Sequence, residues 1–117
     1  MEGLIYWEFF CLFTKLRLVT INVEGLQSPL KRTQVFQSFI DFGVDVVALQ
    51  ETHCDANVIE TWKSEWPGPS CWTTYRSNSA GVAFLFHPTP DTRILDTKSD
   101  PNGRLLRVLV EINGTVF

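Results

Sequence analysis

Apolar and polar residues follow one another along this chain in blocks that predict strands and helices in turn. Leu16–Val23 alternates with a two-residue period, which predicts a strand. Val44–Gln50 is an almost continuous apolar run, which is typical of a strand buried on both faces. Between them, Ser28–Pro29 predicts the start of a helix and Gly43 its end. Such a strand–helix–strand unit places its two strands parallel, so both end at the same edge of the sheet.

The rest of the chain predicts one more helix and several more strands. The helix is expected over Asp55–Trp66, with Asp55 as its N-cap. The expected strands are Cys71–Tyr75, Gly81–His87, Arg93–Thr97 and Arg104–Ile112. Asn113–Gly114 predicts a type I′ hairpin turn, but the sequence stops as the returning strand begins. We therefore interpret the sequence as a fragment of a larger domain.

Residues 1–15 differ in character from the rest. Met1–Phe13 is apolar and aromatic, but it is too short to span a bilayer and Glu8 interrupts it. A signal peptide needs positive charge before its apolar stretch, and here the first positive residue, Lys15, follows it. We expect an extension that packs loosely, or a stretch added by a gene model, followed by one truncated domain over residues 16–117.

Charge and cysteine usage narrow the function classes. A formal net charge of -3 is not that of a protein that holds nucleic acid by bulk attraction. It still allows a nuclease in which an acidic metal site lies beside a local basic patch. The three cysteines are odd in number and show no CxxC spacing, so neither a disulfide framework nor a zinc site is indicated. A reducing, intracellular setting fits this usage.

One carboxylate and one carboxamide stand out as candidate chemistry. Glu51 follows the buried strand directly and Asn22 ends the preceding strand, so both are expected at the sheet edge where ligands bind in α/β proteins. Magnesium prefers oxygen ligands and often takes only one or two carboxylates plus phosphate oxygens. The pair suits metal-assisted phosphodiester chemistry, although a solvated loop glutamate is the alternative. His53 is either a general base or an ordinary loop histidine.

The same segments resemble the first part of the endonuclease/exonuclease/phosphatase superfamily. The resemblance rests on the strand ending in Asn22, on LQETH around Glu51, and on the segments SAGVAFLF and DPNGRLLRVLVEING. It extends over Leu16–Phe117 and is strongest toward the apurinic-type endonuclease domain of non-LTR (LINE-type) retrotransposons. It implies an α/β fold (α+β in some classifications), the N-terminal half of a four-layer αββα, DNase I-like sandwich.

The resemblance also implies roles for particular residues. Glu51 would bind Mg²⁺ or Mn²⁺, and Asn22 would position the metal and the scissile phosphate of a DNA substrate. The implied reaction is hydrolysis of a phosphodiester, which in a retrotransposon nicks DNA to prime reverse transcription. Arg76 is a candidate phosphate contact, with an exposed loop charge as the alternative. No membrane or obligate protein partner is indicated, and the expected location is intracellular, nuclear if the protein functions.

The second part of the family pattern is not found in this sequence. An Asp-x-Asn pair, a tyrosine upstream of it and a terminal Asp-His pair are implied by the resemblance but have no counterparts here, and His53 is not the implied catalytic histidine. We expect the second sheet to be largely absent, one face of the first sheet to be uncovered and the chain to be inactive alone. The alternatives are a non-catalytic retroelement remnant and a phosphatase of the same superfamily.

Overall fold

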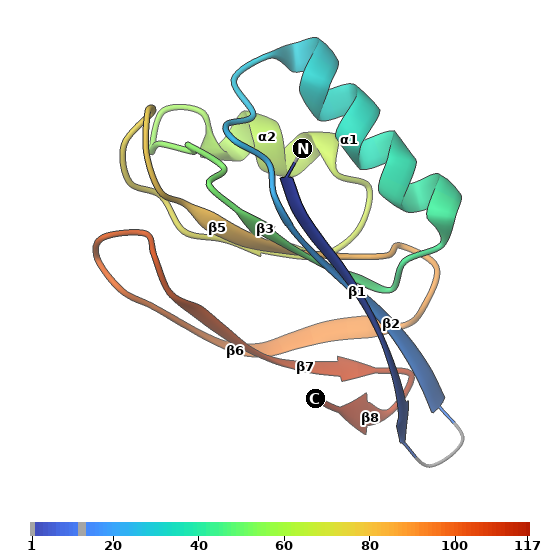
Figure 1. Ribbon diagram of the computed structural model, residues 1–117. Coiled ribbons are helices and arrows are strands. Elements are labelled where there is room, and N and C mark those ends of the chain that lie inside the picture. The colour runs from blue at the N-terminus through green and yellow to red at the C-terminus, as the bar shows by residue number, and fades with distance from the viewer. Residues whose placement is uncertain (1, 12–13) are drawn as a thin grey trace.

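The computed structural model describes residues 2–11 and 14–117. Its elements are β1 (Glu2–Cys11), β2 (Thr14–Asn22), α1 (Pro29–Phe42), β3 (Val46–Gln50), α2 (Ile59–Glu65), β4 (Ser70–Trp72), β5 (Val82–Phe86), β6 (Thr92–Ser99), β7 (Leu106–Ile112) and β8 (Thr115–Val116). The strands form a five-stranded sheet of order β1-β2-β3-β5-β4 and a three-stranded sheet of order β6-β7-β8. Figure 1 shows both helices on one face of the larger sheet and the smaller sheet on the other. This is part of the DNase I-like architecture, as the sequence predicts.

The crossover from β2 through α1 to β3 forms as expected. β2 and β3 are parallel, and Asn22 is the Cα partner of Gln50 at their ends. The Ser28 side chain caps α1 by accepting a hydrogen bond from the N–H of Lys31, 3.3 Å away. Gly43 ends the helix in the left-handed conformation with φ +64°. Local sequence signals therefore determine this unit.

Two apolar clusters hold the three layers together. The first lies between the helices and the larger sheet and includes Phe36 of α1, Trp62 of α2 and Leu49 of β3. The second lies between the two sheets, where Phe86 of β5 packs in the same cluster as Val110 of β7. β3 and β5 are thus covered on both faces, which explains the continuous apolar runs in their sequences.

The second sheet is where the sequence expectation needs correction. We expected one face of the first sheet to lack a cover, but β6, β7 and β8 cover it. The smaller sheet and the turn between β6 and β7 carry exposed apolar residues, namely Leu95, Leu105 and Leu109. The hairpin at Asn113–Gly114 forms, with positive φ at both residues, as a type I′ turn requires.

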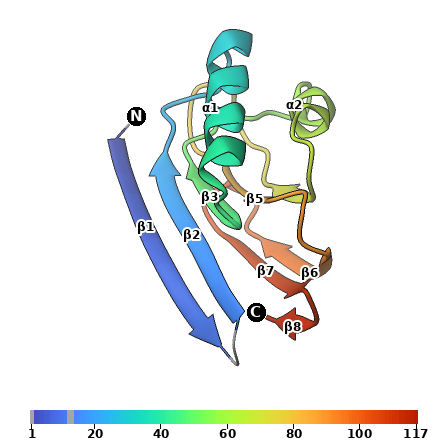
Figure 2. The ribbon, with the colours of Figure 1, turned by 90° about the vertical axis from the view of Figure 1, so that its right-hand side faces the viewer.

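The N-terminal segment also differs from its expected form. In place of a loosely packed extension, residues 2–11 form β1, an edge strand paired antiparallel with β2 (Figure 2). Leu4, Ile5, Tyr6 and Trp7 remain about half exposed on this edge. The apolar and aromatic segment is therefore a paired strand, whereas a domain boundary at residue 16 stays a prediction.

Three further differences concern element ends. α2 begins at an N-cap Val58 that makes no side-chain cap bond, so the prediction of Asp55 as N-cap is wrong. Asp55 instead accepts the N–H of Asn57 in a local turn. β4 stops at Trp72, earlier than expected, and β6 runs on to Ser99.

No helix in the described part of the chain is long and apolar enough to cross a membrane.

Candidate active site

The candidate site lies where β2 and β3 end. Because the two strands are parallel and in register, Asn22 and Glu51 leave the sheet at the same edge, with Asn22 beside Gln50. The expectation that the two residues share one edge is confirmed. We call the surroundings of Glu51, formed by residues 22–27, 50–54, 77–81 and 103–104, the Glu51 rim.

Two loops hold the backbone that carries Glu51. On one side, the N–H groups of Gly25 and Leu26 donate to the carbonyls of Glu51 and Thr52 at 2.7 and 3.0 Å. On the other side, the N–H of Thr52 donates to the carbonyl of Gly81 at 3.0 Å, and the N–H of His53 donates to that of Ala80 at 2.9 Å. Backbone bonds on both sides fix the path of the chain immediately after the catalytic candidate.

This fixed backbone includes unusual conformations. Glu24, Glu51, His53 and Ala80 all have positive φ, between +52° and +59°. Residues other than glycine rarely adopt such angles, and each costs about 1–3 kcal/mol where the surrounding structure imposes it. Their clustering at one edge of the sheet marks the Glu51 rim as a functional candidate independently of the residue types.

The Glu51 carboxylate is held by one of its oxygens only. Oε2 accepts the backbone N–H of Ala80 at 3.0 Å and lies 3.2 Å from Nε2 of His53. Within the described part of the chain, Oε1 has no hydrogen-bond or ion-pair partner, and 38% of the side chain is exposed. The carboxylate borders a cavity of about 210 Å³ lined by Gln50, Glu51, Ala80, Gly81, Val82, Gly103 and Arg104.

Asn22 lies at the same edge of the sheet, but its side chain makes a different contact. Its Oδ1 accepts the N–H of Glu24 at 3.0 Å, which stabilises the turn after β2. Asn22 is not among the residues that line the cavity at Glu51. The structure thus brings Asn22 and Glu51 to one edge, and a shared ligand for them stays a prediction.

The two candidate arginines differ in position. Arg76 is exposed, and its guanidinium carbon lies 4.9 Å from the centre of the Tyr75 ring rather than in the cavity. Arg104, which the sequence analysis did not single out, lines the cavity beside Glu51. Its only sequence signal was its place after the Asp100–Gly103 turn.

That turn is anchored to the Glu51 rim. The Asp100 carboxylate accepts the N–H groups of Arg104 and Leu105 at 2.8 and 2.9 Å. These backbone hydrogen bonds, from Leu105 first and Arg104 second, lower the pKa of Asp100 below its usual value. The carbonyl of Gly103 in turn accepts the N–H of Gly81 at 2.8 Å. The chain segment carrying Arg104 is thus bonded to the segment that donates to Glu51.

The oxygen atoms available as ligands at the Glu51 rim suit a hard cation. No group of three or more histidine, cysteine, aspartate or glutamate side chains gathers in residues 2–11 and 14–117. Magnesium nevertheless needs only one or two carboxylates, because water and substrate phosphate supply its other ligands. An oxygen without a partner next to an arginine-lined cavity is compatible with that mode of binding, so Glu51 fits the implied metal.

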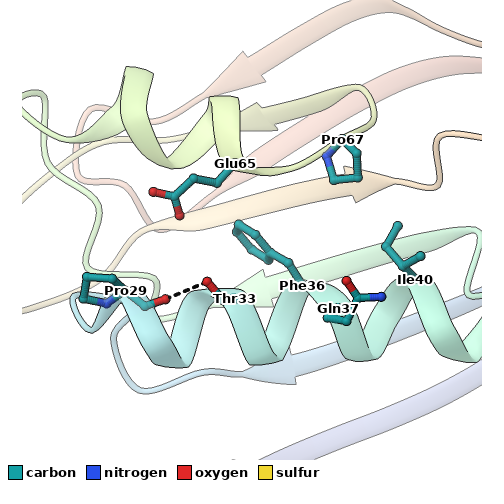
Figure 3. Close-up of a pocket in the computed structure, with 7 residues that line it drawn as sticks. All are labelled: Pro29, Thr33, Phe36, Gln37, Ile40, Glu65 and Pro67. Carbon is teal, nitrogen blue, oxygen red and sulfur yellow. Dashed lines mark hydrogen bonds between the residues drawn. The ribbon is translucent and has the colours of Figure 1, made fainter.

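A hollow between α1 and α2, in contrast, is structural. This space has a volume of about 400 Å³. Phe36, Ile40 and Pro67 line it with apolar side chains (Figure 3). Its one carboxylate, Glu65, forms a bidentate pair with Arg32, through Nε at 2.8 Å and Nη2 at 3.0 Å. Nothing in this hollow combines an available charge with a fixed donor set.

Comparisons with known proteins identify the family to which the chain is similar. Residues 19–117 match the family described as the Endonuclease/Exonuclease/phosphatase family. Over 102 residues, the chain is 30% identical to the Transposon TX1 uncharacterized 149 kDa protein of Xenopus laevis. That alignment covers 87% of this chain and 8% of the transposon protein, so the chain corresponds to a small part of its relative.

Proposed function

Because the chain belongs to the endonuclease/exonuclease/phosphatase family, we propose that it carries the Glu51 side of a divalent-metal-dependent endonuclease site. The substrate is DNA, and the reaction is hydrolysis of one phosphodiester bond, of the type that retrotransposons use to nick a target. A DNA substrate also assigns the functional protein to the nucleus.

One observation carries the proposal. Both hydrogen-bond donors at the Glu51 carboxylate converge on Oε2, while Oε1 has no partner in the described residues and the side chain remains partly open to solvent. Glu65, in contrast, has both carboxylate oxygens bonded to the guanidinium of Arg32. The arrangement at Glu51 instead leaves one lone-pair-bearing oxygen oriented by the fold and available to a ligand.

Each of these residues has its own role in the proposed site. Glu51 supplies an anionic oxygen to Mg²⁺ or Mn²⁺, and Asn22 supplies an amide group at the same edge. Arg104 provides positive charge for a substrate phosphate in the cavity, and Arg76 remains a candidate contact further along the DNA backbone. When bound, the cation supplies charge stabilisation at the phosphate and activation of water.

Among the alternatives, two observations favour a DNA-directed activity. The relative found by sequence comparison is a transposon protein, which supports a nuclease over a lipid or inositol phosphatase. The strained backbone around Glu51 favours a retained site over a non-catalytic remnant, because such conformations persist only where the fold imposes them.

Plasmid nicking with Mg²⁺ tests the proposal. The assay compares the 117-residue chain with a longer polypeptide that also supplies the Asp-x-Asn and Asp-His groups that the resemblance implies. We expect nicking by the longer polypeptide only, and a loss of at least about 100-fold on Glu51→Gln, because the cation contributes several kcal/mol of charge stabilisation.

Glu60→Gln is the matched control. Glu60 is exposed on α2 and undergoes the same change of charge away from the rim, so its activity should equal that of the unmodified protein. Full activity of Glu51→Gln would remove Glu51 from the metal site. Release of phosphate from an inositol phosphate without plasmid nicking would assign the phosphatase alternative.

A further inference from the structure

A hydrogen-bonded chain of side chains extends from Glu51 through His53 to Gln27. Nε2 of Gln27 donates to the carbonyl of Ser77 and lies 3.3 Å from Nδ1 of His53. Nε2 of His53 lies 3.2 Å from Oε2 of Glu51. From its place in the sequence, His53 is either a general base or an ordinary loop histidine. We propose a third role: His53, oriented by Gln27, is a positioning residue that directs Oε1 of Glu51 to the cation.

The donor and acceptor at each step follow from chemistry. The Ser77 carbonyl can only accept, so it fixes the amide of Gln27 with its NH₂ group toward both Ser77 and His53. An NH₂ group can only donate, so Nδ1 of His53 accepts from it. The proton of the neutral imidazole is therefore on Nε2, where it is donated to Glu51.

The consequence for Glu51 is that both donors hold the same oxygen. Nε2 of His53 and the N–H of Ala80 reach Oε2 from the β3 end and from the segment before β5. Rotation of the carboxylate would break both bonds, so Oε2 is held in place and Oε1 is left for the cation. Partners that orient a ligating side chain are commonly worth about 10–100-fold in metal affinity or activity.

The histidine is itself well fixed. Its side chain is 18% exposed, and its backbone N–H is bonded to Ala80. The backbone passes close beneath the ring at Gly25, where an added Cβ would lie 2.7 Å from Nδ1 of His53 and collide with Oε1 of Gln27. Gly25 therefore permits the contact between Gln27 and His53, which a larger residue would displace.

This inference rests on the proposed function, and a titration of the 117-residue chain with Mn²⁺, followed by electron paramagnetic resonance, separates the two. We expect His53→Phe, which keeps a ring but removes both nitrogens, to weaken Mn²⁺ binding about tenfold or more. Gln27→Met should weaken it less, since only the far end of the chain of bonds is lost. His53→Gln restores an N–H donor and should bind within about threefold of the unmodified chain.

His87→Phe is the control, because His87 lies outside the rim, where Nδ1 of its ring accepts the N–H of Thr89. Failure of the unmodified chain to bind Mn²⁺ would reject the metal site and the positioning role together. Binding that is lost in Glu51→Gln but unchanged in His53→Phe would reject the positioning role alone. Equal weakening by His53→Phe and His53→Gln would also reject it, because the donor would then be irrelevant.

A second measurement needs no metal. Long-range ¹H–¹⁵N NMR spectra of the ring distinguish the two tautomers of a neutral histidine. We expect His53 to carry its proton on Nε2 and to shift toward a mixture of tautomers in Gln27→Met, while His87 is unaffected. A proton found mainly on Nδ1 of His53 in the unmodified chain would overturn the proposal.

Discussion

Two glutamates of this chain have similar exposure and opposite surroundings. The side chain of Glu51 is 38% exposed and that of Glu65 is 33% exposed. Both oxygens of Glu65 are bonded to the guanidinium of Arg32, which is itself only 6% exposed. Glu51 has no cationic side chain of lysine or arginine within ion-pair distance in the described residues, and only one of its oxygens is bonded.

The difference shows how exposure alone fails to identify a site. The Arg32–Glu65 pair satisfies its own charges and connects α1 to α2. Nη1 of Arg32 also donates to the carbonyls of Leu26 and Gln27 in the loop before α1. The guanidinium carbon of Arg32 also lies over the ring of Trp62, 4.9 Å from the ring centre. Glu65 therefore stabilises the fold. Within the described residues, Glu51 has only one bonded oxygen, so its carboxylate is available to a ligand.

The largest effect should come from breaking the structural pair. Arg32→Ala removes a buried guanidinium together with its contacts to two carbonyls and to Trp62, so we expect unfolding free energy to fall by about 3 kcal/mol. Urea unfolding measures this loss. Glu51→Gln should change stability by less than about 0.5 kcal/mol, as a surface substitution does. Equal losses in both variants would contradict the distinction between the two glutamates.

A smaller loss is expected from Gly81, which supports the donor to Glu51. A Cβ there would collide with Oγ1 of Thr52 and lie 3.3 Å from the N–H nitrogen of His53. Gly81→Ala should therefore cost about 2 kcal/mol in urea unfolding and weaken Mn²⁺ binding. Gly114→Ala is the matched control, since φ is +86° but nothing lies within 4 Å of the added Cβ. Similar costs at both positions would show that only the backbone angle matters.

The burial of Cys54 and Cys71 should be visible in the reactivity of their thiols. Burial raises the pKa of Cys54 to about 12 and that of Cys71 to about 11. We expect neither thiol to react with iodoacetamide at pH 8 in the folded chain, as peptide mass spectrometry can show for each cysteine.

The same pKa values give a stability prediction with a defined sign. Because the folded pKa values exceed the usual thiol value of 9.0, the contribution of each protonated thiol is complete below pH 9. It is then lost as the pH rises toward about 11 and 12. Urea unfolding should therefore show a smaller alkaline loss in Cys54→Ala, which has no thiol to titrate there. An identical alkaline decline in that variant would contradict the assignment.

The smallest effect is expected at Asp100. Its carboxylate holds the turn before Arg104, so Asp100→Asn should lower the melting temperature by less than Gly81→Ala does. The depressed pKa means that the contribution of Asp100 is present above the unfolded pKa of the group and is lost as pH falls through the folded value. The melting temperatures of the unmodified chain and of Asp100→Asn should therefore converge in acid. A constant difference down to low pH would instead indicate a role for Asp100 that is independent of its charge.

Much of the fold could be predicted from local patterns. The unit from β2 to β3, its Ser28 cap and its Gly43 terminus follow from two periodicities and from turn residues that act within a few positions. The prediction failed where tertiary pairing decided the outcome. β1 is a strand because β2 offers an edge to pair with, and α2 starts later than the Asp55 signal because Asp55 is used in a local turn.

The sequence by itself determined that Asn22 and Glu51 reach the same edge, because parallel strands joined by a helix must end on one side. Only the tertiary structure decided what surrounds them. The N–H of Ala80 comes to Glu51 from 29 positions away, and Gln27 meets His53 across 26 positions. Arg104 reaches the cavity through a turn bonded to Gly81. These contacts depend on strand register and on loops that pack against each other, and no short-range pattern in the chain encodes such distances.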